Sequence, residues 1–292
     1  MSPFEQSMVF TKMHVSGNDF CLINGLHRRY SFNPDEIRRL GDRRTGVGFD
    51  QLILIESLLD TKGDVAVEFF NSDGSKTDQC GNGCAAAVAY LQKHRLVRKT
   101  IVRLESSHQI TECAIVDSDK QNCYTVDVSL GIPRLNPADV PFLAEKQQTQ
   151  YELDVPSQNK PILISVVSLG NPHAVIVVPD VDQVALDQLG TEIQQHESFP
   201  QSTNVEVLEI QDGSNGRLRI FERGVGETRA CGTGAAAAMI AGRLLQSFTS
   251  SVHMKMRGGS TLIRWKGMEN PVIVRCKPLF TFTGTVPISS FS

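Results

Sequence analysis

Short runs of β-branched and aromatic residues recur along most of the chain, and this pattern predicts a mainly β protein. Each run is bounded by Gly, Asn, Asp or Pro, the residues that favour turns at strand ends. The predicted strands cover residues 49–56, 65–70, 162–167, 173–178, 217–221 and 272–276.

Two alanine-rich segments interrupt this pattern and predict helices over residues 83–96 and 234–245. Alanine has the highest helix propensity, and its small side chain suits close packing inside a surrounding sheet. A surface helix is predicted over residues 34–43, because Asn33 is a good N-cap and Pro34 suits the first helical position. Residues 136–160 are rich in prolines and glutamines, and we expect them to form an exposed excursion within the second half of the chain.

An internal repeat relates the two halves of the sequence. The segment from Phe70 to Cys80-Gly-Asn-Gly matches the segment from Phe221 to Cys231-Gly-Thr-Gly at an offset of 151 (231 − 80). Gly17-Asn18 and Asp50-Gln51 match Gly170-Asn171 and Thr203-Asn204 at an offset of 153 (171 − 18 and 204 − 51). Three landmarks in the same order indicate two homologous halves.

The repeat and the length of 292 residues together predict two domains. We expect an α/β (α+β) architecture of two pseudo-symmetric domains, each a mainly antiparallel, barrel-like sheet around a central helix. The first domain is expected to span residues 1–125 and the second residues 126–276, with the C-terminal segment 277–292 returning to the first.

The charge balance indicates a small-molecule partner. Lysine plus arginine total 29 and aspartate plus glutamate 32, without a dense basic cluster, so nothing favours nucleic acid or a membrane surface. The sequence lacks an N-terminal signal segment and any apolar run long enough to span a membrane. Seven cysteines without framework-like spacing favour reduced thiols in a cytoplasm.

The strongest chemical signal is the pair of Cys-Gly-x-Gly turns at Cys80 and Cys231, each at a strand-to-helix junction. Backbone N–H groups and the helix dipole converge there, which is expected to lower the thiol pKa and to favour a bound carboxylate. One such turn could equally be a phosphate loop or a nucleophile elbow. Two such turns, each with a cysteine, fit epimerisation. Inverting a tetrahedral carbon needs a base on one face and an acid on the other. No cofactor motif is present, and we expect no cofactor and no metal.

The remaining cysteines and polar candidates also have plain structural interpretations. Cys84 is expected to pack in the core, because no histidine or second thiol pair completes a metal site. Cys21, Cys113, Cys123 and Cys276 are expected to be structural. His173 could be an ordinary hydrogen-bonded residue, Arg223 and Glu222 could be solvated, and the asparagines could simply form turns.

With these motifs in place, the sequence resembles the diaminopimelate epimerase family over nearly its whole length. The shared motifs are Met13-His14, Gly17-Asn18-Asp19-Phe20, Gly46-Val47-Gly48-Phe49-Asp50-Gln51, Phe70-Asn71, Cys80-Gly81-Asn82-Gly83, Gly170-Asn171-Pro172-His173, Thr203-Asn204, Glu222-Arg223-Gly224, Gly226-Glu227-Thr228, Ala230-Cys231-Gly232 and Gly258-Gly259. The resemblance implies interconversion of LL- and meso-diaminopimelate in lysine and peptidoglycan synthesis. It also implies a two-domain α/β fold with the active site in the interdomain cleft, and a homodimer.

The resemblance further implies roles for individual residues. Cys80 and Cys231 would be the catalytic acid/base pair, with His173 and Glu222 beside the reacting centre. The substrate-binding residues would be Gly81, Asn82, Gly232 and Thr233 at the reacting carboxylate, Asn18, Asn71, Asn171, Asn204 and Arg223 at the distal amino-acid end, and Gln51.

One departure from the family pattern lies beside the first thiol. The family usually continues Ala-Arg-Cys after the first Cys-Gly-Asn-Gly, whereas Cys84-Ala85-Ala86 follows here. This leaves two alternatives open: a pyridoxal-phosphate-independent racemase of another amino acid, or an isomerase like the phenazine-biosynthesis enzymes. A non-catalytic metabolite-binding protein on the same scaffold is a third.

Overall fold

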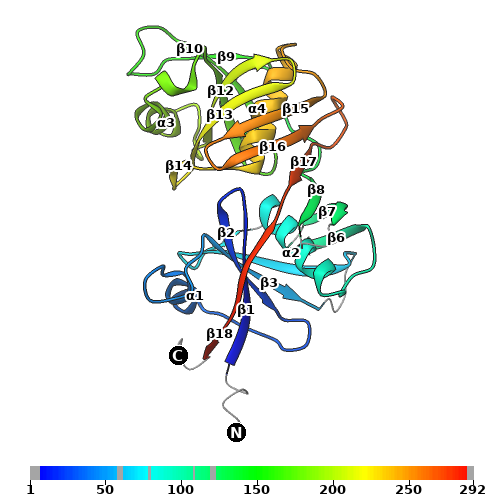
Figure 1. Cartoon of the computed structure of the whole chain (residues 1–292). Helices are drawn as coiled ribbons and strands as arrows, with labels where there is room; N and C mark the ends of the chain where they lie inside the picture. Colours follow the sequence, from blue (N-terminus) through cyan, green and yellow to red (C-terminus); the bar gives the residue numbers. More distant parts are fainter. Residues whose placement is uncertain (1–6, 58–61, 78–79, 108, 119–122, 288–292) are drawn as a thin grey trace. The chain divides into compact units, whose positions relative to one another are not determined.

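The computed structural model describes residues 7–57, 62–77, 80–107, 109–118 and 123–287. The chain divides into two compact units (Figure 1). Unit 1 contains the described residues up to Val128 together with those from Cys276 onward, and unit 2 spans Ser129–Arg275. Of the C-terminal segment predicted to return to the first domain, residues 288–292 lie outside the described part.

The elements of unit 1 are, in chain order, β1 (Ser7–Val15), β2 (Asn18–Asn24), α1 (Pro34–Gly41), β3 (Gln51–Glu56), β4 (Val65–Asn71), β5 (Lys76–Thr77), α2 (Gly81–Lys93), β6 (Ile101–Ser106), β7 (Gln109–Ser118), β8 (Tyr124–Ser129) and β18 (Leu279–Pro287). Strand β1 pairs antiparallel with both β2 and β18. The β2–β3 and β4–β6 pairs are parallel, while β3–β4, β4–β5, β6–β7 and β7–β8 are antiparallel. The sheet is therefore mixed, with mostly antiparallel pairs.

The elements of unit 2 are η2 (Pro137–Asp139), β9 (Tyr151–Leu153), β10 (Ile162–Ser168), β11 (Pro172–Val177), η3 (Val181–Gln183), α3 (Leu186–Gln194), β12 (Asn204–Asp212), β13 (Asn215–Glu222), β14 (Gly226–Thr228), α4 (Gly232–Leu244), β15 (Ser251–Met256), β16 (Gly259–Arg264) and β17 (Ile273–Cys276). Here the parallel pairs are β11–β12 and β13–β15. The pairs β9–β10, β10–β11, β12–β13, β13–β14, β15–β16 and β16–β17 are antiparallel.

The two units share strand register as well as element order. Phe20 lies opposite Gln51 in the parallel β2–β3 pair, and His173 lies opposite Asn204 in the parallel β11–β12 pair. Both correspondences have the offset of 153 found in the sequence (173 − 20 and 204 − 51). The register therefore identifies structurally equivalent positions in the two units.

Helices α2 and α4 each lie against the strands of their own unit. Helix α2 contacts β1, β2, β3 and β7, and α4 contacts β10 to β13 together with β15 and β16 (Figure 1). Residues Ala85–Ala87 and Ala235–Ala238 are fully buried, as expected for helices that are apolar on all sides. Both helices begin two residues before the predicted starts, which makes Cys80 and Cys231 their N-cap residues.

The predicted strands all form, with ends shifted by at most two residues. Helix α1 also forms, with Asn33 as N-cap in a capping box with Glu36. The prediction that residues 136–160 form an exposed excursion is wrong in part. The segment belongs to unit 2, but Val140, Phe142 and Tyr151 are buried in that unit's core. Apolar residues between its prolines and glutamines, including Leu153 and Val155, belong to the same core cluster.

Candidate active site

Cys80 and Cys231 cap the two central helices in nearly the same backbone conformation. Cys80 has φ −148° and ψ 95°, and Cys231 has φ −137° and ψ 120°. The first intrahelical bonds close one turn later, from the Cys84 N–H to the Cys80 carbonyl and from the Ala235 N–H to the Cys231 carbonyl. The first-turn N–H groups therefore have no partner within the helix and can bind an anion beside each sulfur.

In unit 1, several predicted site residues form a hydrogen-bond network around Cys80. The Cys80 thiol donates to Gln51 Oε1 (2.8 Å), and Gln51 Nε2 donates to Asn71 Oδ1 (3.0 Å). The Gly83 N–H donates to the Cys80 sulfur (3.2 Å). Asn82 Nδ2 donates to Asn18 Oδ1 at 3.3 Å, so the asparagine after Gly81 joins the same region.

A charged network that the sequence analysis did not single out holds the Asn18 turn. Asp50 accepts from the Asn18 side chain (3.0 Å) and from the Asp19 N–H (3.1 Å). Arg43 bridges Asp19 and Asp50, and Lys12 donates to Asp19. Burial alone would raise the pKa of Asp19, but the hydrogen bonds from Arg43 and Lys12 outweigh it and lower this pKa to about 2. Asp19 is therefore ionised and can fix this turn.

In unit 2, a continuous chain of polar contacts runs from Cys231 into the interior. The Cys231 sulfur lies 3.3 Å from Thr233 Oγ1, and Asn171 Nδ2 donates to the same oxygen at 3.4 Å. Asn171 Oδ1 lies 3.0 Å from His173 Nε2, and His173 Nδ1 lies 2.7 Å from Glu206 Oε1. The structure therefore brings three predicted residues together with Cys231 and adds Glu206.

Glu206 was missed by the sequence analysis, although a signal was present. It is a charged residue inside the apolar run Val205–Leu208, and it is fully buried. The equivalent position in unit 1, by register and by the offset of 153 (206 − 53), is Ile53. A carboxylate at a position where the other half carries isoleucine indicates a purpose other than packing.

The expectation that the turn lowers the thiol pKa is wrong for Cys231 in this structure. Burial raises the pKa of Cys231 well above its ordinary value, and the negative charge of Glu222 raises it further. The hydroxyl of Thr233 acts in the opposite direction but does not outweigh them. Desolvation of the thiolate is therefore stronger here than the stabilisation that the helix start provides.

The remaining predicted residues of unit 2 lie along strands β12 and β13. Asn204 is buried and donates to the Pro172 carbonyl (3.0 Å), while its Oδ1 accepts the Arg223 N–H (2.9 Å). The Arg223 guanidinium is exposed and donates to the Gln201 carbonyl (2.9 Å). Asn204 thus fixes the backbone that carries Arg223, and the guanidinium stays accessible to a carboxylate.

The other cysteines differ in burial. Cys21, Cys84, Cys113 and Cys276 are buried, as a packing role requires, whereas Cys123 is exposed. Burial raises the pKa of Cys21 and of Cys276 to about 12. Ala85, which replaces the family's usual arginine, is also fully buried.

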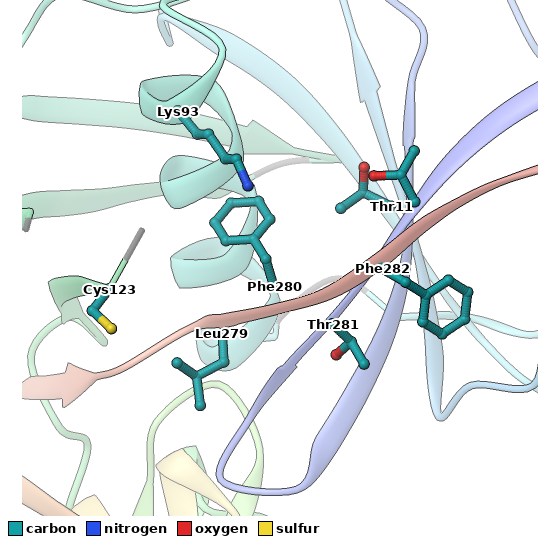
Figure 2. A pocket seen from close by; sticks show the side chains of 8 residues that line it. Thr11, Lys93, Cys123, Leu279, Phe280, Thr281 and Phe282 are labelled. Carbon is teal, nitrogen blue, oxygen red and sulfur yellow. The ribbon is translucent and has the colours of Figure 1, made fainter. Parts of the chain in front are cut away.

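One pocket of unit 1 is lined by none of the predicted site residues. Its volume is about 290 Å³, and its lining includes Thr11, Lys93, Cys123 and Phe280 (Figure 2). The Lys93 ammonium lies over the Phe280 ring, 3.9 Å from its centroid. Among the described residues, no group of three or more His, Cys, Asp or Glu side chains has the arrangement of a metal site. No helix in the described part of the chain is long and apolar enough to cross a membrane.

Comparison with known proteins connects this geometry to a family. The model of the diaminopimelate epimerase family matches residues 10–135 and 165–278, which include both cysteine turns. The chain belongs to the diaminopimelate epimerase family. It is 41% identical to the diaminopimelate epimerase of Nitrosomonas europaea, covering 96% of this chain and 98% of that protein. It is 39% identical to that of Ectopseudomonas mendocina, covering 95% and 98%. The family match omits residues 136–164, which include the segment whose exposure was mispredicted.

Solved structures share the fold with this family member at low sequence identity. A hydroxyproline epimerase from Agrobacterium vitis superposes with a TM-score of 0.67 at 15% identity, covering 97% of this chain and 93% of that one. A PhzF-family phenazine biosynthesis protein from Bacillus anthracis has a TM-score of 0.67 at 12% identity, covering 96% and 99%. The predicted two-domain α/β architecture is confirmed, and the family is that of an isomerase.

Proposed function

We propose that the protein is a cofactor-independent epimerase that interconverts LL-2,6-diaminopimelate and meso-diaminopimelate. The observation that carries the proposal is the duplication of one arrangement: a cysteine N-caps the central helix of each unit and has its own polar contacts. Family membership supports diaminopimelate as the substrate, because relatives named diaminopimelate epimerase are about 40% identical to this chain over nearly its full length.

In the proposed reaction, one cysteine acts as a thiolate and removes the α-proton. The other acts as a thiol and returns a proton to the opposite face of the same carbon. The roles exchange in the reverse direction, so that each turnover leaves the two sulfurs in exchanged protonation states. General acid–base catalysis of this kind contributes on the order of 10²- to 10⁴-fold in rate.

The helix starts stabilise the charge that develops when the Cα–H bond breaks. The N–H groups of Gly81 and Asn82, and of Gly232 and Thr233, would donate to the α-carboxylate as it takes up negative charge. Donors that are already oriented need no reorganisation during the reaction, which makes this electrostatic contribution large. Glu222 would lie beside the reacting centre, and its charge contributes to the raised pKa of Cys231.

The distal end of diaminopimelate carries a second amino-acid group, for which the site supplies polar side chains. Asn18, Asn71 and Asn171 would supply amides at this end, and Asn204 would act through the Arg223 backbone that it holds. Arg223 offers an exposed guanidinium whose planar fork suits a carboxylate. Asn18 is held by Asp50, so its amide is already oriented before any ligand binds.

The direct test is incubation of the reduced protein with LL-diaminopimelate in deuterated water. We expect meso-diaminopimelate carrying deuterium at the inverted α-carbon, because the returning proton comes from a thiol that exchanges with solvent. Absence of both exchange and meso product refutes the proposal. Proline, hydroxyproline and glutamate in parallel reactions serve as controls, and faster turnover of one of them would identify a racemase of another amino acid instead.

We propose in addition that the enzyme works as a cytoplasmic homodimer. Reduced thiols are required for the mechanism and are maintained in the cytoplasm. Light scattering coupled to gel filtration measures the mass directly, and a monomer mass at assay concentration would contradict the dimer.

A further inference from the structure

The His173–Glu206 pair occupies positions where the fold itself requires only apolar bulk. By strand register, the equivalent residues in unit 1 are Phe20 and Ile53, and all four side chains are fully buried. Burying a charged pair costs several kcal/mol of desolvation, which its mutual attraction only partly repays. Since the same architecture forms in unit 1 without such a pair, packing does not explain its presence in unit 2.

The geometry of the pair fixes how many protons it holds. His173 Nε2 faces the carbonyl oxygen of Asn171 at 3.0 Å, so Nε2 must carry a hydrogen. His173 Nδ1 lies 2.7 Å from Glu206 Oε1, and two bare acceptors would repel at that distance. One further proton therefore lies between Nδ1 and Oε1, on either atom.

The surroundings of Glu206 favour retention of that proton. Its second oxygen, Oε2, is buried and has no hydrogen-bond partner among the described residues. Burial raises the pKa of Glu206, and the nearby charge of Glu222 adds to this increase, whereas His173 lowers it. A carboxyl group with one unpartnered buried oxygen is least costly when its negative charge is neutralised.

This proton sets the direction of each hydrogen bond as far as Cys231. With Nε2–H donating to Asn171 Oδ1, the other end of the same amide, Nδ2, donates to Thr233. Thr233 Oγ1 accepts that bond, so its own hydrogen is available to the Cys231 sulfur 3.3 Å away. A hydroxyl that donates to sulfur stabilises the thiolate over the thiol.

We propose that Glu206 is a positioning residue for Cys231, because the proton it shares with His173 orients Asn171 and Thr233 so that a hydrogen bond is donated to the sulfur. The inference rests on the proposed function for its catalytic meaning. Its physical content, the thiolate character of Cys231, is measured without substrate. If the pair loses its proton, His173 would keep Nδ1–H toward Glu206, Asn171 would turn its amide, and Cys231 would become the donor to Thr233.

Two uncharged replacements of similar size separate the donated hydrogen bond from the charge. Glu206→Gln retains an N–H that can donate to Nδ1, and Glu206→Met retains none. The readout is the iodoacetamide alkylation rate of Cys231 at one fixed pH in the reduced, substrate-free full-length protein, followed by peptide mass spectrometry. The exposed Cys123 is the internal reference.

The Gln variant is expected to alkylate within about twofold of wild type, and the Met variant on the order of tenfold more slowly, as for loss of a hydrogen bond to a charged group. Equal rates in the two variants overturn the proposal. Faster alkylation of Cys231 in both variants also overturns it. The removal of the Glu206 charge would then matter more for the thiolate than the orientation of Asn171 and Thr233.

A double variant serves as a control in case Glu206→Met does not fold. His173→Phe/Glu206→Ile installs the residues that unit 1 uses at the equivalent positions, and it is expected to fold with an unchanged or higher Tm. The alkylation rate of Cys231 in the double variant should fall like that in Glu206→Met, and a wild-type rate in the folded double variant contradicts the proposal.

With diaminopimelate as substrate, Glu206→Met should lower kcat and leave KM within about twofold, since no substrate contact is removed. Absence of turnover in wild type would refute the proposed function and leave the alkylation test intact.

Discussion

At the scale of single residues, the two catalytic candidates are equivalent in backbone and different in surroundings. Cys80 donates to Gln51, whereas Cys231 contacts Thr233 and is influenced by Glu222. The sequence predicted both cysteines, because each begins a Cys-Gly-x-Gly turn at the matching place in the two halves of the internal repeat. It could not predict their partners. Glu206 is connected to Cys231 only through His173, Asn171 and Thr233, and these side chains come together through strand pairing in the folded chain.

The raised pKa of Cys231 predicts how its reactivity depends on pH. A pKa above the ordinary thiol value leaves less thiolate at any given pH, so alkylation of Cys231 should increase mainly at pH values above the range in which an ordinary thiol ionises. Burial is the largest cause and the charge of Glu222 the next. Glu222→Gln should therefore lower this pKa and speed alkylation of Cys231 severalfold, roughly as for removal of one nearby charge.

The measurement is the alkylation rate of Cys231 relative to Cys123 as a function of pH, in wild type and Glu222→Gln. An unchanged pH profile would mean that the Glu222 charge does not reach Cys231 in solution.

At the scale of elements, alanine content and β-branched runs were sufficient to predict the two central helices and six of the strands. The error over residues 136–160 came from composition, because Phe142 and Tyr151 are sparse in sequence yet meet in the core, with ring centroids 4.8 Å apart. The charged network that holds Asn18 was also missed, since Lys12 in β1 and Arg43 in the turn after α1 are far apart in sequence and both contact Asp19 only in the folded chain.

Gly234 lies in the first turn of helix α4 and packs against the Glu206 side chain. A Cβ atom at this position would lie 2.7 Å from Glu206 Oε1. Gly234→Ala should therefore lower stability by about 1–3 kcal/mol through overpacking, although alanine is favoured over glycine in a helix by roughly 1 kcal/mol.

Urea denaturation of Gly234→Ala measures this change, and Gly213→Ala is the matched control. A Cβ at Gly213 meets its nearest atom at 3.6 Å, so its effect should stay within about 0.5 kcal/mol. Stabilisation of Gly234→Ala would show that Glu206 moves aside freely.

At the scale of the whole molecule, one unit is built from two separate stretches of sequence and the other from a single stretch. Strand β18 pairs with β1, so the end of the chain completes the sheet in which the chain begins. Residues 277–292 were predicted to return to the first domain, and the described part of that segment includes β18, which pairs with β1.

Gly284 tests the role of the returning strand. A Cβ at this position would lie 2.5 Å from the Phe10 ring, so Gly284→Val should loosen the β1–β18 ladder. Hydrogen exchange is expected to accelerate in β1 and β18, with β12 and β13 protected as in wild type. Simultaneous loss of protection in β12 and β13 would show that the two units do not respond independently.

The central claim is that both thiols are required at one carbon, and single substitution of each cysteine tests it most directly. Cys80→Ser and Cys231→Ser are each assayed for conversion of LL- to meso-diaminopimelate in deuterated water, with Cys84→Ser as a control outside the mechanism. Each of the first two should lose conversion by on the order of 10²- to 10⁴-fold, while Cys84→Ser retains it. Wild-type conversion by either Cys80→Ser or Cys231→Ser would contradict the two-thiol account.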